Sequence, residues 1–301
     1  AQQAILYDVQ TDTVIFEKNA DELMSPSSMS KLMTVYYIFK KIDDGEILLT
    51  DKFQVSEKAW KKGGSKMFLK VNSYVTIEDL LRGIIVQSGN DACITIAEGF
   101  SGTESSFAEE LNILAKEIGL TDSFFSNSTG WPDPDHLMSA RDILKLSLKT
   151  IRDFPDLYKI YSEKEFSYSN IKQNNRNPLL FSDSYTDGLK TGRTSLGGFG
   201  LAASSKRKDR RVILVLNGLE SNNQRKKESK RFMDIAFNNF KNLKILEKGQ
   251  LIDKINVWNG SENKIEVKSN QNLIINVPKI DDCISASSSS SIASILSSTS
   301  S

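Results

Sequence analysis

The sequence contains few of the residues from which disulfide frameworks and histidine sites are built. Its 301 residues include two cysteines, Cys93 and Cys283, and one histidine, His136. Two cysteines are too few for a disulfide framework, and one histidine argues against a multi-histidine zinc site and against a Ser-His-Asp triad with a spare histidine. Cys93 falls within the apolar helical pattern 92–100, so we expect it to be buried; the sequence leaves its pairing with Cys283 open.

The chain also lacks a strong net charge and a long apolar run. Its net charge of +1 gives no basic field for a nucleic acid, so we expect no nucleic-acid partner. No run reaches the roughly 18–20 apolar residues that span a bilayer. The hydrophobic fraction of 39% and the charged fraction of 26% are ordinary for a globular protein. The length allows one large domain and a small one.

Ser28 and Lys31 stand at the start of an expected helix. Apolar residues follow at helical spacing as far as about Ile42, and Ser27 or Ser28 could cap the first turn. Positions three apart share one helix face, so the amine of Lys31 can reach the hydroxyl of Ser28. The unpaired N–H groups of a first turn can stabilise an oxyanion. Alone, however, a Ser-x-x-Lys pair is more often a capping serine and a solvated lysine.

Two further tripeptides favour the catalytic interpretation. Ser88-Gly89-Asn90 follows the helical run 77–87, and Lys190-Thr191-Gly192 follows Asp187-Gly188-Leu189. In this order, Ser-x-x-Lys, Ser-x-Asn and Lys-Thr-Gly are the motif set of penicillin-binding proteins and related β-lactamases.

Longer stretches resemble one branch of that group, the serine-type D-alanyl-D-alanine carboxypeptidases, which are low-molecular-mass penicillin-binding proteins. The resemblance extends from residue 1 to about residue 278. The stretches that carry it are 4–8, 16–21, 84–92, 131–136 and 187–192.

The resemblance implies an α+β fold of the β-lactamase and transpeptidase type, in which helices flank an antiparallel sheet and a helical subdomain lies to one side. The periodicity alone gives only α+β segments. We expect strands at 4–9, 13–17, 189–191, 199–205 and 211–216, helices at 28–42, 77–87, 91–100, 104–118, 140–151 and 221–240, and an extended region at 164–182.

The domain prediction follows from the same patterns. We expect a catalytic domain over 1–243, with the helical subdomain at about 77–151, and a small, incomplete β-rich domain over 244–280. Three short strands are expected there, at 252–258, 264–267 and 273–277. Residues 281–301 are mostly serine and should be disordered, because they cannot bury enough apolar surface. They carry no Lys or Arg for a lipid headgroup, so this end does not support the membrane attachment found in relatives.

The resemblance implies acyl transfer through a serine ester. Ser28 would attack the carbonyl of the penultimate D-alanine in a peptidoglycan stem peptide. Lys31 would take the proton, which requires its pKa to fall from about 10.4 toward 7. Burial and the nearby cation of Lys190 both push in that direction. Ser88 would relay a proton to the leaving amine, and Asn90 would hold the Lys31 amine and the substrate amide.

Substrate binding is expected along the strand that carries Lys-Thr-Gly. Gly192 permits close approach of the backbone, and Lys190 and the hydroxyl of Thr191 are the first candidates to bind the terminal carboxylate. The N–H groups of Ser28 and Arg193 would form the oxyanion hole. Arg225 is a further candidate for the carboxylate and matches an arginine that the family has before an acidic helix start, although it could equally be a solvated charge at a helix end. In the family, a loop such as 61–69 rims the site.

Several alternatives remain open. A β-lactamase would need a Glu in a Glu-x-x-Leu-Asn pattern, but Ala108 stands three residues before Leu111-Asn112. An endopeptidase would use the same acyl-enzyme, and a non-catalytic peptidoglycan-binding protein could share the fold. His136 could be a base, but the family does not use it so, and a structural hydrogen bond is the better interpretation.

The resemblance also sets the expected surroundings. It implies a bacterial periplasmic or extracytoplasmic protein from which a signal peptide has been removed. Its partners would be the peptidoglycan pentapeptide stem and β-lactam antibiotics. No cofactor and no metal are implied.

Overall fold

The computed structural model describes residues 1–258 and 263–279. Its main element is a five-stranded sheet in the order β2-β1-β11-β10-β9, in which every neighbouring pair is antiparallel. The predicted α+β fold with an antiparallel sheet is therefore confirmed. The strands are β1 (Gln3–Asp8), β2 (Thr13–Lys18), β9 (Thr186–Thr194), β10 (Gly198–Arg207) and β11 (Arg210–Leu219).

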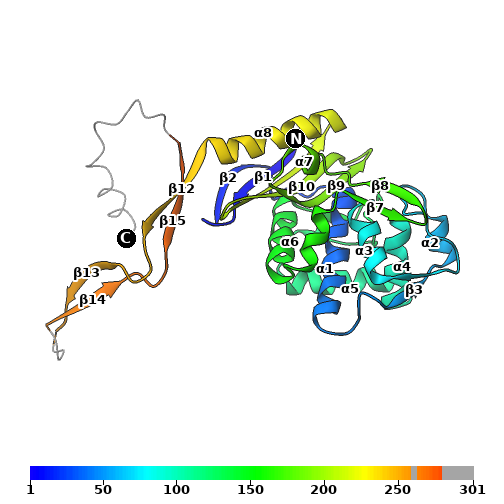
Figure 1. Cartoon of the computed structure of the whole chain (residues 1–301), viewed down its shortest axis with the longest axis horizontal. Helices are drawn as coiled ribbons and strands as arrows, with labels where there is room; N and C mark the ends of the chain where they lie inside the picture. Colours follow the sequence, from blue (N-terminus) through cyan, green and yellow to red (C-terminus); the bar gives the residue numbers. More distant parts are fainter. Residues whose placement is uncertain (259–262, 280–301) are drawn as a thin grey trace. The chain divides into compact units, whose positions relative to one another are not determined.

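Helices cover both faces of this sheet (Figure 1). α1 (Lys31–Asp43) and α6 (Ala140–Asp153) lie on one face, and α8 (Asn222–Asn238) lies on the other. Phe232 of α8 packs on Phe16 of β2, with ring centroids 5.3 Å apart. Because apolar layers lie on both sides, the central strand β11 has an unbroken apolar run, 212–216, and every residue of it is buried.

The helical part of the molecule begins its helices with polar caps. Thr76, Thr103 and Ser139 each accept a hydrogen bond from the backbone N–H three residues later, which satisfies one of the unpaired donors of a first turn. These residues start α3, α5 and α6 close to the predicted positions. This part of the molecule contains five helices among the described residues, one of which is α6. The other four are α2 (Glu57–Lys61), α3 (Ile77–Ile85), α4 (Asn90–Ser101) and α5 (Glu104–Glu117).

The first turn before α1 differs from the expectation. Ser27–Ser30 form a 3-10 turn, η1, with Pro26 at its N-cap position and no side-chain cap. Ser27 has a positive φ of 52° and donates its hydroxyl to Thr194 Oγ1 at 3.0 Å instead of capping the helix. The cap prediction was wrong because this serine ties η1 to the end of β9.

The extended region predicted at 164–182 is only partly extended. β7 (Glu165–Tyr168) and β8 (Ile171–Asn174) form a hairpin, but α7 (Leu179–Ser182) is helical. The N–H of Leu179 donates to Asn177 Oδ1 at 3.0 Å, so a side chain just before Pro178 starts this turn. The remaining short elements are β3 (Lys52–Gln54), β4 (Tyr74–Thr76), β5 (Ser123–Phe124), β6 (Leu137–Met138) and η2 (Leu157–Ser162).

The chain divides into two compact units, of which the first is Ala1–Ala236 and the second begins at Phe237. The boundary expected at 243 falls within a strand missing from the prediction, β12 (Phe240–Leu246). This strand pairs with β15 (Leu273–Pro278), while β13 (Leu251–Asn256) pairs with β14 (Lys264–Lys268). The division thus lies before β12. The tail predicted at 281–301, with Cys283, lies outside the described residues.

Candidate active site

Ser28 and Lys31 lie one turn apart where η1 passes into α1. Lys31 Nζ donates to Ser28 Oγ at 3.0 Å, so the contact predicted from the spacing is present. The Lys31 side chain is completely buried, with 0% of its surface exposed. A buried amine next to a serine hydroxyl is the arrangement that activation of the serine requires.

Two more acceptors surround the Lys31 amine. Asn90 Oδ1 accepts from Nζ at 2.8 Å, and the backbone carbonyl of Thr129 accepts as well. A charged ammonium has three protons for these three oxygens. A neutral amine would donate to Asn90 and Thr129 and keep its lone pair for the Ser28 hydroxyl proton. The site therefore accommodates both protonation states.

Burial shifts the pKa values of both motif lysines downward. Burial lowers the pKa of Lys31 to about 8, and the charges of Arg176 and Lys62 contribute in the same direction. The pKa of Lys190 is also well below its ordinary value, first because of burial and then because of the charge of Lys31. Lys190 Nζ lies 3.5 Å from the carbonyl of Thr191, a weak contact. The positive charge of Lys31 thus disfavours the charged form of Lys190.

The Ser88-Gly89-Asn90 segment supplies two polar groups with different surroundings. Ser88 has a positive φ of 64°, and its buried Oγ has no hydrogen-bond partner among the described residues. An unpartnered buried hydroxyl is free to exchange a proton with a bound molecule. Asn90 instead donates Nδ2–H to the carbonyl of Gly63 at 2.9 Å and keeps a second amide proton.

The loop at 61–69 is fixed to the site by Asp91. One carboxylate oxygen of Asp91 accepts from the N–H of Met67 at 3.0 Å, and the other accepts from the N–H of Leu69 at 3.2 Å. Gly64 and Ser65 of this loop line the main cavity. The expectation that this loop rims the site is confirmed.

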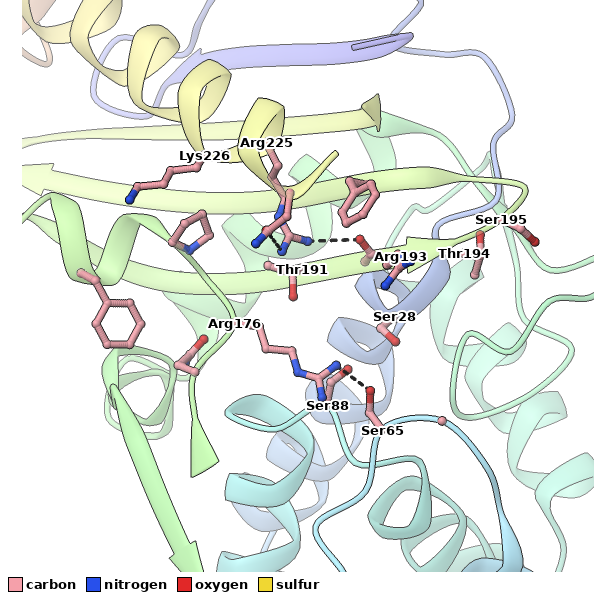
Figure 2. Close-up of a pocket in the computed structure, with 17 residues that line it drawn as sticks. Ser28, Ser65, Ser88, Arg176, Thr191, Arg193, Thr194, Ser195, Arg225 and Lys226 are labelled. Carbon is pink, nitrogen blue, oxygen red and sulfur yellow. Dashed lines mark hydrogen bonds between the residues drawn. The ribbon is translucent and has the colours of Figure 1, made fainter. Parts of the chain in front are cut away.

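The main cavity has a volume of about 1050 Å³ and is lined by Ser28 (Figure 2). Figure 2 shows Ser28 between β9, which carries Thr191 and Arg193, and the loop that carries Ser65. No carboxylate belongs to the lining, all of which lies in the described part of the chain. The cavity is therefore positively charged. The site residues predicted from the sequence that line this cavity are Ser28, Ser88, Thr191, Gly192, Arg193 and Arg225. The positively charged residues of the lining are Arg176, Arg193, Arg225 and Lys226.

Arg225 reaches the cavity from the first turns of α8 and is 7% exposed. Its guanidinium donates to the carbonyls of Gly192 and Gly200 at 3.4 and 3.3 Å, and to Asn222 Oδ1 at 2.7 Å. Burial lowers its pKa to about 10. The alternative of a solvated charge at a helix end is wrong, because this side chain joins α8 to β9 and β10.

Sequence reasoning missed two groups of the site. Arg176 lines the cavity and donates to Ser65 Oγ at 2.6 Å. It stands among asparagines, in a segment without periodicity, so no pattern points to it. The Thr129 carbonyl is a backbone group, and no side-chain motif could reveal its contact with Lys31.

His136 has a structural role, as expected. It is 2% exposed, and its Nδ1 accepts from the N–H of Ser126 at 3.2 Å. Burial lowers its pKa to about 4, so the ring is neutral near pH 7. Cys93 is buried and is a free cysteine.

Comparisons with known proteins agree with this arrangement. Residues 1–221 match the family of D-alanyl-D-alanine carboxypeptidases. The chain is 38% identical over 284 residues to the D-alanyl-D-alanine carboxypeptidase DacA of Haemophilus influenzae, across 93% of this chain and 72% of that protein. This chain belongs to the D-alanyl-D-alanine carboxypeptidase family.

Solved structures place the fold of this family member among penicillin-binding proteins. Penicillin binding protein 5 from Haemophilus influenzae superposes with a TM-score of 0.84 at 38% identity, over 93% of this chain and 83% of that one. Penicillin-binding protein D2 from Listeria monocytogenes, in its ampicillin-bound form, gives a TM-score of 0.71 at 25% identity, over 78% and 96%. The α+β fold with helices flanking an antiparallel sheet is thus common to these proteins.

No group of three His, Cys, Asp or Glu side chains suited to a metal ion is found within 1–258 and 263–279. In the same residues, no helix has both the length and the apolar character needed to cross a membrane.

Proposed function

We propose that this family member is a serine DD-carboxypeptidase that removes the terminal D-alanine from peptidoglycan stem peptides through an ester on Ser28. The observation that carries the proposal is the buried contact of 3.0 Å between Lys31 Nζ and Ser28 Oγ at the wall of a cationic cavity. Family membership supports the reaction, and the motif residues supply its groups.

In the first step, Ser28 Oγ attacks the carbonyl carbon of the penultimate D-alanine, and its proton passes to neutral Lys31. The negative charge that develops on the carbonyl oxygen is stabilised by the N–H groups of Ser28 and Arg193. Because Asn90 and Thr129 hold the Lys31 amine from the other side, its lone pair stays directed at the serine.

The tetrahedral intermediate then loses the terminal D-alanine as its C–N bond breaks. The leaving amine takes a proton from Lys31, directly or through the unpartnered hydroxyl of Ser88. Water next attacks the Ser28 ester and gives up a proton to Lys31, and Lys31 passes a proton to Ser28 Oγ as the ester C–O bond breaks. The products are the shortened peptide with a new carboxylate and free Ser28.

Substrate binding depends on β9 and the cavity beside it. β9 is the last strand of the sheet, so its outer edge can pair with an extended peptide. The terminal carboxylate of that peptide binds near Thr191, Arg176 and Arg225, in the absence of any competing carboxylate in the lining. A bound carboxylate favours the charged form of Lys190, and the charge of Lys190 in turn favours neutral Lys31.

The alternatives are weakened by specific observations. A β-lactamase of the Glu-dependent type needs a carboxylate beside the ester, whereas none lines the main cavity. A non-catalytic protein would have no need for the assembled Ser28, Lys31 and Asn90 contacts. An endopeptidase would use the same residues, so its distinction from a carboxypeptidase depends on which peptides are cut.

The proposed substrate places the protein in the bacterial periplasm or another extracytoplasmic compartment, where it acts on the cell wall. β-Lactam antibiotics are proposed as a second class of ligand. The ampicillin-bound Listeria protein, at 25% identity, supports that part of the proposal.

Intact-mass spectrometry after incubation with benzylpenicillin tests the chemistry. We expect the protein to gain the mass of one penicillin and to keep it for minutes, since no carboxylate lies beside the ester. Ser28→Ala should gain no mass. Ser65→Ala, which alters another serine of the cavity wall, should still be acylated. Rapid turnover of penicillin would favour a β-lactamase, and product analysis on a stem pentapeptide separates carboxypeptidase from endopeptidase.

A further inference from the structure

A second, smaller cavity of about 240 Å³ adjoins Ser28. It shares Ser28, Arg193 and the turn after β9 with the main cavity, but its other wall comes from the loop 129–132. Asn90, Thr129, Trp131 and Pro132 line it. We call this cavity the Trp131 subsite.

The position of the two cavities along β9 fixes which part of a substrate each can hold. Both cavities are lined by the end of β9 and the residue after it, Arg193 to Ser195, but only the main cavity also includes Thr191, Arg176 and Arg225. A peptide whose terminal carboxylate lies at Thr191 therefore continues past Ser28 toward Ser195. It runs antiparallel to β9, and the residue before its D-Ala-D-Ala end reaches the Trp131 subsite.

The charge in the described lining of this subsite is positive. Arg193 is the only ionisable residue of its described lining, and no carboxylate belongs to that lining. Lys62 Nζ lies 4.5 Å from the centroid of the Trp131 ring, so a second cation is held against the wall. The charge of Lys62 also lowers the pKa of the buried Lys31, against the opposing and smaller effect of Asp91, so the field of Lys62 reaches into the site.

The nearest acidic side chains of the same loop do not oppose these cations. Asp133 and Asp135 are absent from the lining. Asp133 Oδ1 instead accepts hydrogen bonds from the Ser126 hydroxyl at 3.0 Å and from the N–H of Asp135 at 2.9 Å. The carboxylate of Asp133 is thus used within its own loop.

We propose that the Trp131 subsite binds the side chain of the residue preceding D-Ala-D-Ala and selects a side chain that carries a free carboxylate. Diaminopimelate, a diamino acid with a second carboxylate, fits this chemistry, whereas lysine presents only an ammonium to Arg193 and Lys62. The Trp131 ring supplies an apolar surface for the methylene groups that the two side chains share. This inference rests on the proposed function, because it requires a peptide acylating Ser28.

Penicillins provide a matched set of probes. In a penicillin, the ring nitrogen that departs lies on the side of the ring carboxylate, so the acylamino substituent occupies the other side of the reactive carbonyl. Carbenicillin, benzylpenicillin and ampicillin differ there by a carboxylate, a hydrogen and an amine on one carbon. The measurement is the second-order rate constant for acylation of Ser28 by each drug. We expect carbenicillin to be favoured over ampicillin after each is corrected for its reactivity with hydroxide.

Two variants test which residues cause the preference for carbenicillin over ampicillin. Arg193→Gln keeps the backbone N–H and removes the charge, and it should lower the carbenicillin-to-ampicillin ratio by roughly three- to fivefold. Lys62→Gln should lower it in the same direction by a smaller factor. Lys66→Gln is the control, because the Lys66 amine on the same loop donates to the carbonyl of Trp60 and does not line the subsite. We compare the ratio of the carbenicillin and ampicillin rate constants because Lys62 also lowers the pKa of Lys31. A change in that pKa alters the acylation rates of all three drugs by the same factor and cancels in the ratio.

The outcomes separate this inference from the proposed function. If benzylpenicillin acylates Ser28 but the ratio is the same in the wild type, Arg193→Gln and Lys62→Gln, the selectivity is overturned and the function stands. If no penicillin acylates Ser28, both are overturned. With stem pentapeptides, we expect a higher kcat/KM for diaminopimelate than for lysine at the third position, with the difference reduced in Arg193→Gln. Equal values in the wild type would contradict the inference.

Discussion

A lysine that is buried without an acidic partner sets the pH dependence of this site. Among the described residues, Lys31 donates to neutral oxygens, and burial outweighs the opposing effects of Cys93 and Asp91 and lowers its pKa to about 8. Only its neutral form can accept the Ser28 proton. We therefore predict that the rate of acylation by benzylpenicillin rises about tenfold per pH unit below this pKa and levels off above it. Stopped-flow measurement between pH 6 and 9.5 checks this.

The contribution of Lys62 to that profile can be isolated. Its positive charge helps lower the pKa of Lys31, so Lys62→Gln should move the midpoint of the profile to higher pH and slow acylation at pH 7. Lys66→Gln should leave the midpoint unchanged. A midpoint that does not move in Lys62→Gln, or a rate that falls as pH rises through 8, would contradict the role of Lys31 as base.

At the scale of single residues, the sequence predicted groups that act through side chains at fixed spacing. The contact between Ser28 and Lys31 follows from helix geometry alone. Arg176 and the Thr129 carbonyl could not be found in this way. Arg176 reaches the cavity because of how the segment around α7 folds, and a carbonyl is the same atom in every residue type.

At the scale of elements, the loop 126–131 is held in place by the start of α5. Glu104 Oε1 accepts from the Ser128 hydroxyl at 2.9 Å and from its N–H at 3.4 Å, and Lys58 pairs with Oε2 at 3.3 Å. Thr34 of α1 donates to the Ser128 carbonyl at 2.8 Å. The next residue, Thr129, presents its carbonyl to Lys31, so these contacts position an acceptor of the proposed base.

Glu104→Ala should therefore weaken both stability and acylation. It leaves the buried donors of Ser128 without an acceptor, which should lower the free energy of unfolding by roughly 1–3 kcal/mol. The acylation rate on the high-pH plateau of the profile should fall as well, because the Thr129 carbonyl is no longer held in position. Glu104→Gln, which can still accept from Ser128, should recover most of both. Urea unfolding and stopped-flow acylation of the folded variants make the comparison.

Elements with strong periodicity or clear caps were predicted well, whereas those set by pairing were not. The helices that start at Thr76, Thr103 and Ser139 begin at capping residues that the sequence displays. β12 was missed because Phe240–Leu246 directly follows α8, and a strand is recognised there only once β15 pairs with it.

At the scale of the whole molecule, every residue proposed for the site belongs to the first compact unit, Ala1–Ala236. The sheet that carries β9 is also complete within it, since its strands end at Leu219. In its described residues, the second unit has two separate two-stranded sheets, each with fewer strands than a sheet usually needs to be stable alone. The chemistry therefore depends on the first unit.

We predict that a chain ending at Asn239 acylates Ser28 with benzylpenicillin at the rate of the full chain. This end keeps α8 whole, including the buried Met233 and Ala236, and removes β12 together with its partner β15. An end at Asn242 would instead keep the first residues of β12 without that partner. Acylation rates and thermal unfolding of the shortened and full chains give the test. If the chain ending at Asn239 is insoluble or reacts slowly while the full chain reacts normally, the catalytic fold requires residues beyond α8.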